Sequence, residues 1–163
     1  MLFSNAPSHS GFTLLETLIV LAIIGIIAAI GIPNVLAIYQ RQQLNNAVNM
    51  VFSALQEAQQ RAIERNHSCI VTFDAGQSKI LANGSNHCLV TGDRSLPTGI
   101  TLAHSGSSSI SYGAKGNTTD NRTILLNLRN SAKAPKCVVV SAPIGILRQG
   151  TYDPAQRLCA SNP

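Results

Sequence analysis

An uninterrupted apolar segment near the N-terminus constrains this chain most. From Phe12 to Ile32 there are 21 residues, and the polar ones among them are Thr13, Glu16 and Thr17. Folded as a helix, such a segment is about 30 Å long, which is enough to cross the hydrocarbon core of a bilayer. We therefore predict a transmembrane helix over residues 12–33.

A cleaved secretory signal is the alternative interpretation of this segment. Such a signal starts with basic residues and has an apolar stretch of about 7–15 residues. Here the first ten residues, MLFSNAPSHS, contain no Lys or Arg, and the apolar stretch is longer. Both features favour the membrane helix.

Glu16 is the anomaly within this helix. A carboxylate at the middle of a membrane helix costs roughly 2.5–3.5 kcal/mol, so it usually has a partner. The chain has no cation within one helical turn of Glu16. Cleavage between Gly11 and Phe12 would create an α-amino group four residues before Glu16, on the same helix face, where it could meet the Glu of a neighbouring copy. We therefore predict that Glu16 acts in assembly.

The stretch GFTLLETLIVLAIIGIIAAIGIP resembles the type III signal of type IV pilins and type II secretion pseudopilins. The shared features are a short leader ending in Gly11, a mature start at Phe12, a carboxylate at the fifth mature position, and Pro33 closing the apolar run. The leader departs from the usual pattern, because its one residue of basic type is His9. The resemblance implies that residues 1–11 are a prepilin leader, which a prepilin peptidase removes on the cytoplasmic side before methylating the new amine. It also implies a single-pass protein of the bacterial inner membrane, with its C-terminal domain outside the cytoplasm or in a filament on the cell surface.

The segment after Pro33 predicts an amphipathic helix over residues 34–66. Its apolar residues recur at spacings of three and four, which forms one stripe along a helix. The stripe consists of Leu44, Val48, Val51, Leu55, Ala58 and Ala62. We expect it to pack on the chain's own domain; a coiled-coil partner is the alternative, although charges that direct such pairing are sparse.

Residues 67–163 predict a β-rich domain. Short runs of β-forming residues alternate with Gly, Asn, Asp and Ser, which favours antiparallel strands joined by turns. The predicted strands are 68–73, 79–82, 87–91, 99–103, 109–113, 122–128, 137–141 and 145–148, and residues 104–109 and the tail CASNP are expected to be loops. The fold class is therefore α+β, with one long N-terminal helix followed by an antiparallel β-sheet domain.

Three blocks of the domain resemble the GspH/FimT family of minor pilins and pseudopilins. They are SALQEAQQRAIERNHSCIVTF, YGAKGNTTDNRTILL and KCVVVSAPIGILRQGTYD. This resemblance implies the type IV pilin-like fold, in which the β-sheet domain wraps the C-terminal half of the helix. It implies a structural subunit that helps to initiate or cap a type IV pilus-type filament together with other major and minor pilins. A minor pseudopilin of a type II secretion system is an alternative.

The four cysteines all lie outside the apolar helix. They contain no Cys-x-x-Cys pair, which argues against a zinc ribbon and excludes a thioredoxin-type motif. In an exported domain an even number of cysteines favours disulfides. Of three possible connectivities we prefer Cys69–Cys88 with Cys137–Cys159, because each pair joins nearby strands or holds the tail; four reduced, buried thiols are the alternative.

The sequence contains no recognisable catalytic signature. The histidines are scattered, the acidic residues are few and separated, and GAKGNTT lacks the Gly-Lys-Ser/Thr ending of a phosphate-binding loop. We expect no enzyme activity, no metal and no cofactor. The chain is expected to be the substrate of the prepilin peptidase.

Basic residues accumulate toward the C-terminus. The chain has 12 Lys and Arg against 7 Asp and Glu, and seven of the basic residues follow position 114. Some FimT-like proteins bind DNA in natural transformation through a Gly-Arg-x-Arg motif. Gly145 and Arg148 match that motif, but Ile146 replaces its first Arg. Double-stranded DNA is therefore a possible partner, contacted by Gly145, Arg148 and the nearby Lys133, Lys136 and Arg157, while dispersed solvated charges are the alternative.

Overall fold

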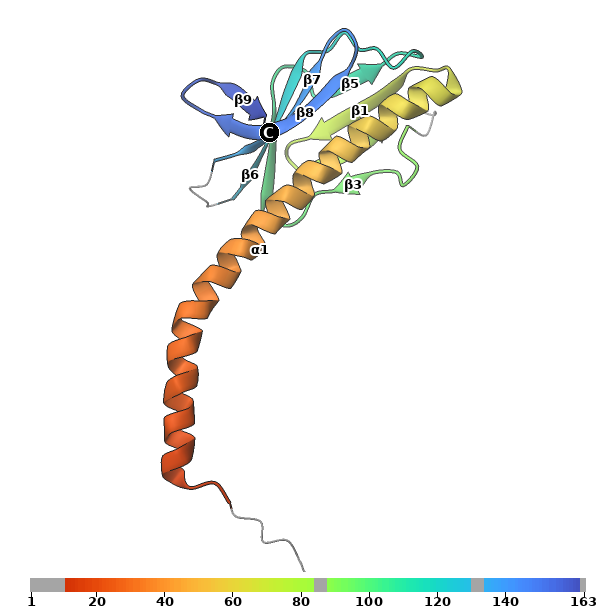
Figure 1. Cartoon of the computed structure of the whole chain (residues 1–163). Coiled ribbons are helices and arrows are strands. Elements are labelled where there is room, and N and C mark those ends of the chain that lie inside the picture. Colours follow the sequence, from red (N-terminus) through yellow and green to blue (C-terminus); the bar gives the residue numbers. More distant parts are fainter. Residues whose placement is uncertain (1–10, 84–87, 130–133, 162–163) are drawn as a thin grey trace, which may run out of the picture. The chain divides into compact units, whose positions relative to one another are not determined.

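The computed structural model describes residues 11–83, 88–129 and 134–161, without the side chains of residues 30–34, 83 and 161. The chain divides into two compact units, Met1–Tyr39 and Gln40–Pro163. One helix, α1 (Leu14–Arg65), contributes residues to both units (Figure 1). Each unit is described by itself below.

The described part of the first unit is the N-terminal half of α1, preceded by residues 11–13, which have no regular secondary structure. Its large apolar side chains are exposed, among them Phe12, Leu14, Ile26 and Tyr39. Among the described residues, no helix is both long enough and apolar enough to span a membrane.

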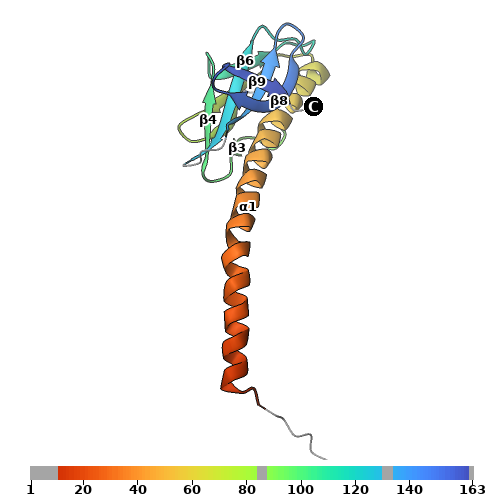
Figure 2. The same cartoon turned by 60° about the vertical axis from the view of Figure 1, so that its left-hand side comes forward.

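In the second unit, the described part of the chain contains nine antiparallel strands in two sheets. The first sheet has the order β3-β2-β1-β5, and the second has the order β4-β6-β7-β8-β9. The strands are β1 (Cys69–Asp74), β2 (Lys79–Asn83), β3 (Arg94–Ser95), β4 (Ile100–His104), β5 (Ser109–Tyr112), β6 (Arg122–Leu128), β7 (Lys136–Ser141), β8 (Ile146–Asp153) and β9 (Leu158–Ser161). Figure 2 shows β8 and β9, in blue, with β4 and β6 of the same sheet.

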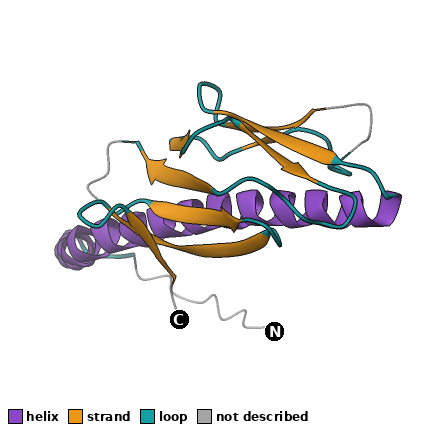
Figure 3. Ribbon diagram, turned by 90° about the horizontal axis from the view of Figure 1, so that it is seen from above, coloured by secondary structure: helices purple, strands orange, loops and turns teal. Residues whose placement is uncertain are grey.

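Both sheets pack on the C-terminal half of α1 (Figure 3). The predicted stripe from Leu44 to Ala62 is buried throughout, together with Ala47 and Ala54, so the expectation that it covers the chain's own domain is confirmed. Alternate residues of the strands face the helix, as a strand's period of two requires. They include Val71 of β1, Ile124 of β6 and Val138 of β7, all within one apolar cluster.

Three sequence predictions on the strands are corrected by the structure. Residues 88–91 form bends and turns instead of the predicted strand 87–91, of which residue 87 lies outside the described part. The run is apolar because Cys88 and Leu89 are buried, and the Val90 N–H donates to the Glu57 side chain instead of a neighbouring strand. The tail predicted as a loop contains β9, and β8 continues past Arg148 to Asp153 because it pairs with both β7 and β9.

Helix α1 ends where its amphipathic pattern ends. Asn66 follows the last helical residue and has a φ of 52°, a left-handed conformation that Asn tolerates better than most residues. The His67 N–H then donates to the carbonyl of Ala62 at 3.2 Å. This capped end turns the chain into β1.

Candidate functional site

The N-terminal candidate site consists of Gly11, Phe12 and Glu16. Residues 11–13 precede the helix, and the Glu16 N–H donates to Thr13 Oγ1 at 3.3 Å, which makes Thr13 the N-terminal cap. Glu16 therefore lies in the first turn, where the helix dipole favours a carboxylate. Within the described part of the chain its side chain forms no ion pair.

Gly11 is open on all sides. A Cβ added at Gly11 would meet no atom within 4 Å. Gly11 and Phe12, the two residues joined by the predicted cleavage bond, are both exposed. An exposed peptide bond outside regular secondary structure is accessible to a protease. The geometry of this segment is compatible with cleavage at the predicted position.

Both expected cysteine pairs form disulfides. Cys69 of β1 is bonded to Cys88, and Cys137 of β7 is bonded to Cys159 of β9. The first bridge fastens the loop after β2 to the start of the first sheet. The second fastens the last strand to β7, across β8.

The described basic residues considered for DNA binding line two different hollows. Lys133 lies outside the described residues. Lys136 donates from Nζ to Thr151 Oγ1 at 3.1 Å and lines a hollow with Arg41. Arg148 and Arg157 line a different hollow, of about 290 Å³, which Lys136 does not reach.

Gly145 has a structural role in this molecule. It has a φ of 75° in the turn between β7 and β8, and an added Cβ would lie 2.9 Å from the carbonyl oxygen of Gly116. The Gln59 side chain reaches the same place and donates to the carbonyls of Gly116 at 2.8 Å and Ile144 at 3.3 Å. Gly145 is thus required for close packing of this turn on α1 and does not line the hollow of Arg148.

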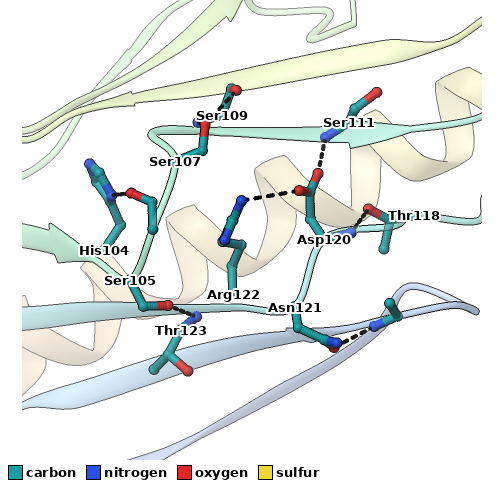
Figure 4. A network of polar contacts seen from close by, with 12 residues as sticks. His104, Ser105, Ser107, Ser109, Ser111, Thr118, Asp120, Asn121, Arg122 and Thr123 are labelled. Atoms are coloured by element: carbon teal, nitrogen blue, oxygen red, sulfur yellow. Dashed lines mark hydrogen bonds and ion pairs between the residues drawn. The ribbon is translucent and has the colours of Figure 1, made fainter.

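A polar network containing His, Ser and Asp lies where the two sheets meet (Figure 4). Asp120 accepts the Ser111 N–H at 3.0 Å and pairs with Arg122 at 3.3 Å, which connects β5 to β6. His104 Nδ1 is 3.1 Å from the carbonyl oxygen of Gly106. No hydrogen bond joins His104 to Asp120 or to a serine hydroxyl in the described part of the chain, so these residues do not form a catalytic triad.

Asp120 of this network also acts on a buried tyrosine. Tyr112 is fully buried, and its hydroxyl has no hydrogen-bond partner in the described part. Burial raises the pKa of Tyr112 well above its ordinary value, and the nearby Asp120 carboxylate raises it further. The described residues also contain no group of three or more His, Cys, Asp or Glu side chains placed to hold a metal ion.

Sequence reasoning missed the polar contacts that fasten the loops to α1. Glu57 pairs with Arg94 of β3, and Gln59 contacts the loop between β5 and β6 and the turn between β7 and β8. Both residues lie outside the apolar stripe of α1, so the helical pattern alone predicts that they are exposed to solvent. Nothing local in the sequence indicates partners more than 30 positions away.

A long N-terminal helix that exposes an apolar half and buries the other half under antiparallel sheets defines the type IV pilin-like class. Residues 7–32 match the prokaryotic N-terminal methylation motif, and residues 47–143 match the type II transport protein GspH. The second match covers more than half of the chain. This chain therefore belongs to the GspH family of minor pilins and pseudopilins.

Relatives of known sequence agree with this assignment. The type IV major fimbrial protein FimA of Dichelobacter nodosus is 38% identical over 131 residues, which cover 78% of this chain and 77% of that protein. A fimbrial protein of Pseudomonas aeruginosa is 50% identical over 56 residues, which cover 34% of this chain and 36% of that protein.

Solved structures share the fold. The type IV minor pilin FimU of Pseudomonas aeruginosa has a TM-score of 0.56 at 13% identity, over 74% of this chain and 96% of that one. The minor pseudopilin EpsH of the Vibrio cholerae type II secretion system has a TM-score of 0.55 at 13% identity, over 67% of this chain and 97% of that one. The predicted α+β, pilin-like fold is confirmed.

Proposed function

We propose that this chain is an inner-membrane subunit that helps to initiate or cap a pilus-type filament after cleavage between Gly11 and Phe12. The observation that carries the proposal is the N-terminal half of α1, whose large apolar side chains are exposed while a single carboxylate occupies its first turn. Such an apolar surface requires an apolar environment, which lipid provides before assembly and neighbouring helices provide in the filament. A bundle of similar helices would provide the second environment.

In this proposal residues 12–33 cross the inner membrane, residues 34–66 connect to the domain, and residues 67–163 lie outside the cytoplasm. Two disulfides in the domain support an oxidising compartment. The proposal that the chain acts as a minor subunit, at a filament end, is supported by FimU and EpsH, which are both described as minor subunits.

Glu16 would act after cleavage. Removal of residues 1–11 places the Phe12 amine four residues before the Glu16 carboxylate, so each carboxylate could pair with the amine of an adjacent subunit. A charge pair inside a helix bundle offsets the cost of each separate charge in an apolar environment. This pairing would also set the axial position of one helix relative to the next.

Cleavage is tested by expressing the full chain with its prepilin peptidase and determining the mature N-terminus. We expect Phe12, carrying a methylated amine. Gly11→Val should block cleavage, because the side chain enters the peptidase's binding site for the residue before the cut. Gly25→Ala is the matched control, since a Cβ at this helical glycine also meets nothing within 4 Å. A different N-terminus in the wild-type chain contradicts the proposal.

Assembly is tested separately with Glu16→Ala. The variant should insert in the membrane and be cleaved normally, but its amount in sheared filaments should fall at least about tenfold, as expected for loss of a desolvated charge pair. Glu16→Asp keeps the charge and should retain part of the incorporation. Normal incorporation of Glu16→Ala would show that the pairing does not direct assembly.

A further inference from the structure

The hollow formed by Arg148 and Arg157 is not used by the N-terminal assembly site. Its wall includes Val139 and Leu158, which are apolar, and its volume is about 290 Å³. Both arginines line it although they come from β8 and from the turn before β9. The fold thus brings two arginine residues from different segments of the chain to one small hollow.

Strand register explains how Arg148 reaches this hollow. Val138 and Val140 face the core, so Val139 between them faces the opposite side of β7. On one side of β7, Arg148 of β8 is directly opposite Val139. On the other side, Thr123 of β6 is opposite Val139. These three residues therefore lie in a row on the side of the sheet that faces away from α1.

Arg157 is brought to the same place by the turn between β8 and β9. It has a φ of 52°, which is uncommon for a residue with a long side chain. The turn is held by the pairing of Asp153 with Leu158 and by the disulfide from Cys159 to Cys137. Cys159 itself lines the hollow. The bridge therefore holds the wall that carries Arg157.

Neither arginine has a carboxylate partner within the described part of the chain. The ion pairs there involve Arg61, Arg94 and Arg122. Arg148 Nη2 donates to Ser141 Oγ at 3.1 Å, which orients the guanidinium and leaves its other N–H groups available. Asp153, the acidic residue nearest in sequence, accepts the N–H of Ala155.

We propose that this hollow binds the carboxylate of a Glu or Asp side chain on a neighbouring pilin-class subunit. The proposal rests on the proposed function, which supplies such a neighbour. Guanidinium groups bind carboxylates through paired N–H donors, and the apolar wall suits the methylene groups of an acidic side chain.

A nucleic acid fits the hollow less well. A phosphodiester backbone presents charges at regular intervals, and proteins bind it through a continuous series of cations. Arg148 and Arg157 line one small hollow, and Lys136 lines another. The two arginines therefore concentrate positive charge at a single location and do not form a continuous series of cations. A single carboxylate matches that arrangement.

The test is a titration of the full chain in detergent micelles, followed by the NMR signals of the arginine Nε–Hε groups. The probe is N-acetyl-glutamate α-amide, which carries one side-chain carboxylate, and N-acetyl-glutamine amide is its neutral control. We expect saturable shifts of Arg148 and Arg157 with the acid and none with the neutral analogue. Arg157→Gln should weaken binding about tenfold or more, as for loss of a charged hydrogen-bonding partner.

Arg129→Gln is the matched variant, because Arg129 is exposed and does not line the hollow. It should leave the binding unchanged. Equal shifts with the neutral analogue, or unchanged binding in both Arg148→Gln and Arg157→Gln, would overturn the proposal. So would a short double-stranded DNA that binds more tightly than the acid and loses its binding in Arg148→Gln, since the partner would then be a nucleic acid.

An assembly experiment separates this proposal from the proposed function. The double variant Arg148→Gln, Arg157→Gln should be cleaved to Phe12 but should be recovered at least about tenfold less in sheared filaments. Normal recovery of this variant contradicts the subunit contact while the proposed function stands. Absence of a Phe12 N-terminus in the wild-type chain contradicts the proposed function, whether or not N-acetyl-glutamate α-amide binds to the hollow.

Discussion

Glu57 of α1 and Arg94 of β3 form an ion pair that fastens the first sheet to the helix. Their side chains are 22% and 19% exposed, so water screens the pair only in part. Arg94 also donates to Ser53 Oγ and Thr91 Oγ1, each at 3.1 Å, and Glu57 also accepts the Val90 N–H at 2.6 Å. The pair thus holds the short edge strand β3 and the loop before it on α1.

Replacing Glu57 by Ala should lower the free energy of unfolding of the domain by about 2 kcal/mol. The change leaves Arg94 mostly buried without its carboxylate and removes the acceptor of the Val90 N–H. Thermal unfolding followed by circular dichroism measures the loss. Glu64→Ala is the matched control, because Glu64 pairs with Arg61 at 3.3 Å on the helix surface and is 49% exposed. It should change stability by about 0.5 kcal/mol or less, and equal losses in the two variants would contradict a special role for Glu57.

The two disulfides should differ in their effect on the hollow, although they enclose similar lengths of chain. Their cysteines are 19 and 22 positions apart, so replacing either pair by Ser should destabilise the domain by about 3 kcal/mol in the chain-entropy model. Only loss of Cys137–Cys159 should also weaken binding of the carboxylate probe, because it frees the turn that carries Arg157. If loss of Cys69–Cys88 weakened the probe equally, the effect would come from general loss of folding.

Tyr112 should make the domain less stable at high pH. Its pKa is raised in the folded state, so the folded protein retains a proton that the unfolded chain releases above about pH 10. Its contribution to stability is therefore complete below that pH and declines as the pH rises further. Tyr112→Phe should remove this part of the decline and cost little at neutral pH, since the hydroxyl has no partner in the described part. Parallel pH profiles of the variant and the wild-type chain would contradict the argument.

Gly145 should tolerate Ala poorly. A Cβ there would lie 2.8 Å from Gln59 Nε2 and 2.9 Å from the Gly116 carbonyl oxygen, in a residue whose φ is 75°. We expect Gly145→Ala to lower the free energy of unfolding by about 2 kcal/mol or more, measured by thermal unfolding. Gly92→Ala isolates the backbone contribution, because Gly92 has a φ of 70° and open space around it. It should cost about 1 kcal/mol, and an equal cost at both glycines would show that close packing at Gly145 contributes nothing.

The strand predictions failed where side-chain burial and backbone pairing do not coincide. Residues 88–91 have strand composition, but Cys88 and Leu89 are buried in a loop that a disulfide and Glu57 hold in place. Conversely, Leu158–Ser161 looks like a tail, and it forms β9 because β8 and the second disulfide hold it. An apolar run indicates burial, and only the fold decides whether its backbone pairs.

Local features of the sequence determined much of this protein. The spacing of Gly11, Phe12 and Glu16, and the helical stripe from Leu44 to Ala62, are properties of one continuous segment, so a one-dimensional pattern is enough to predict them. The tertiary structure alone decided that Arg148 and Arg157 share a hollow while Lys136 lines another. That outcome depends on strand register and on the hairpin of β8 and β9, because a shift of one residue would turn Arg148 to the opposite face of the sheet.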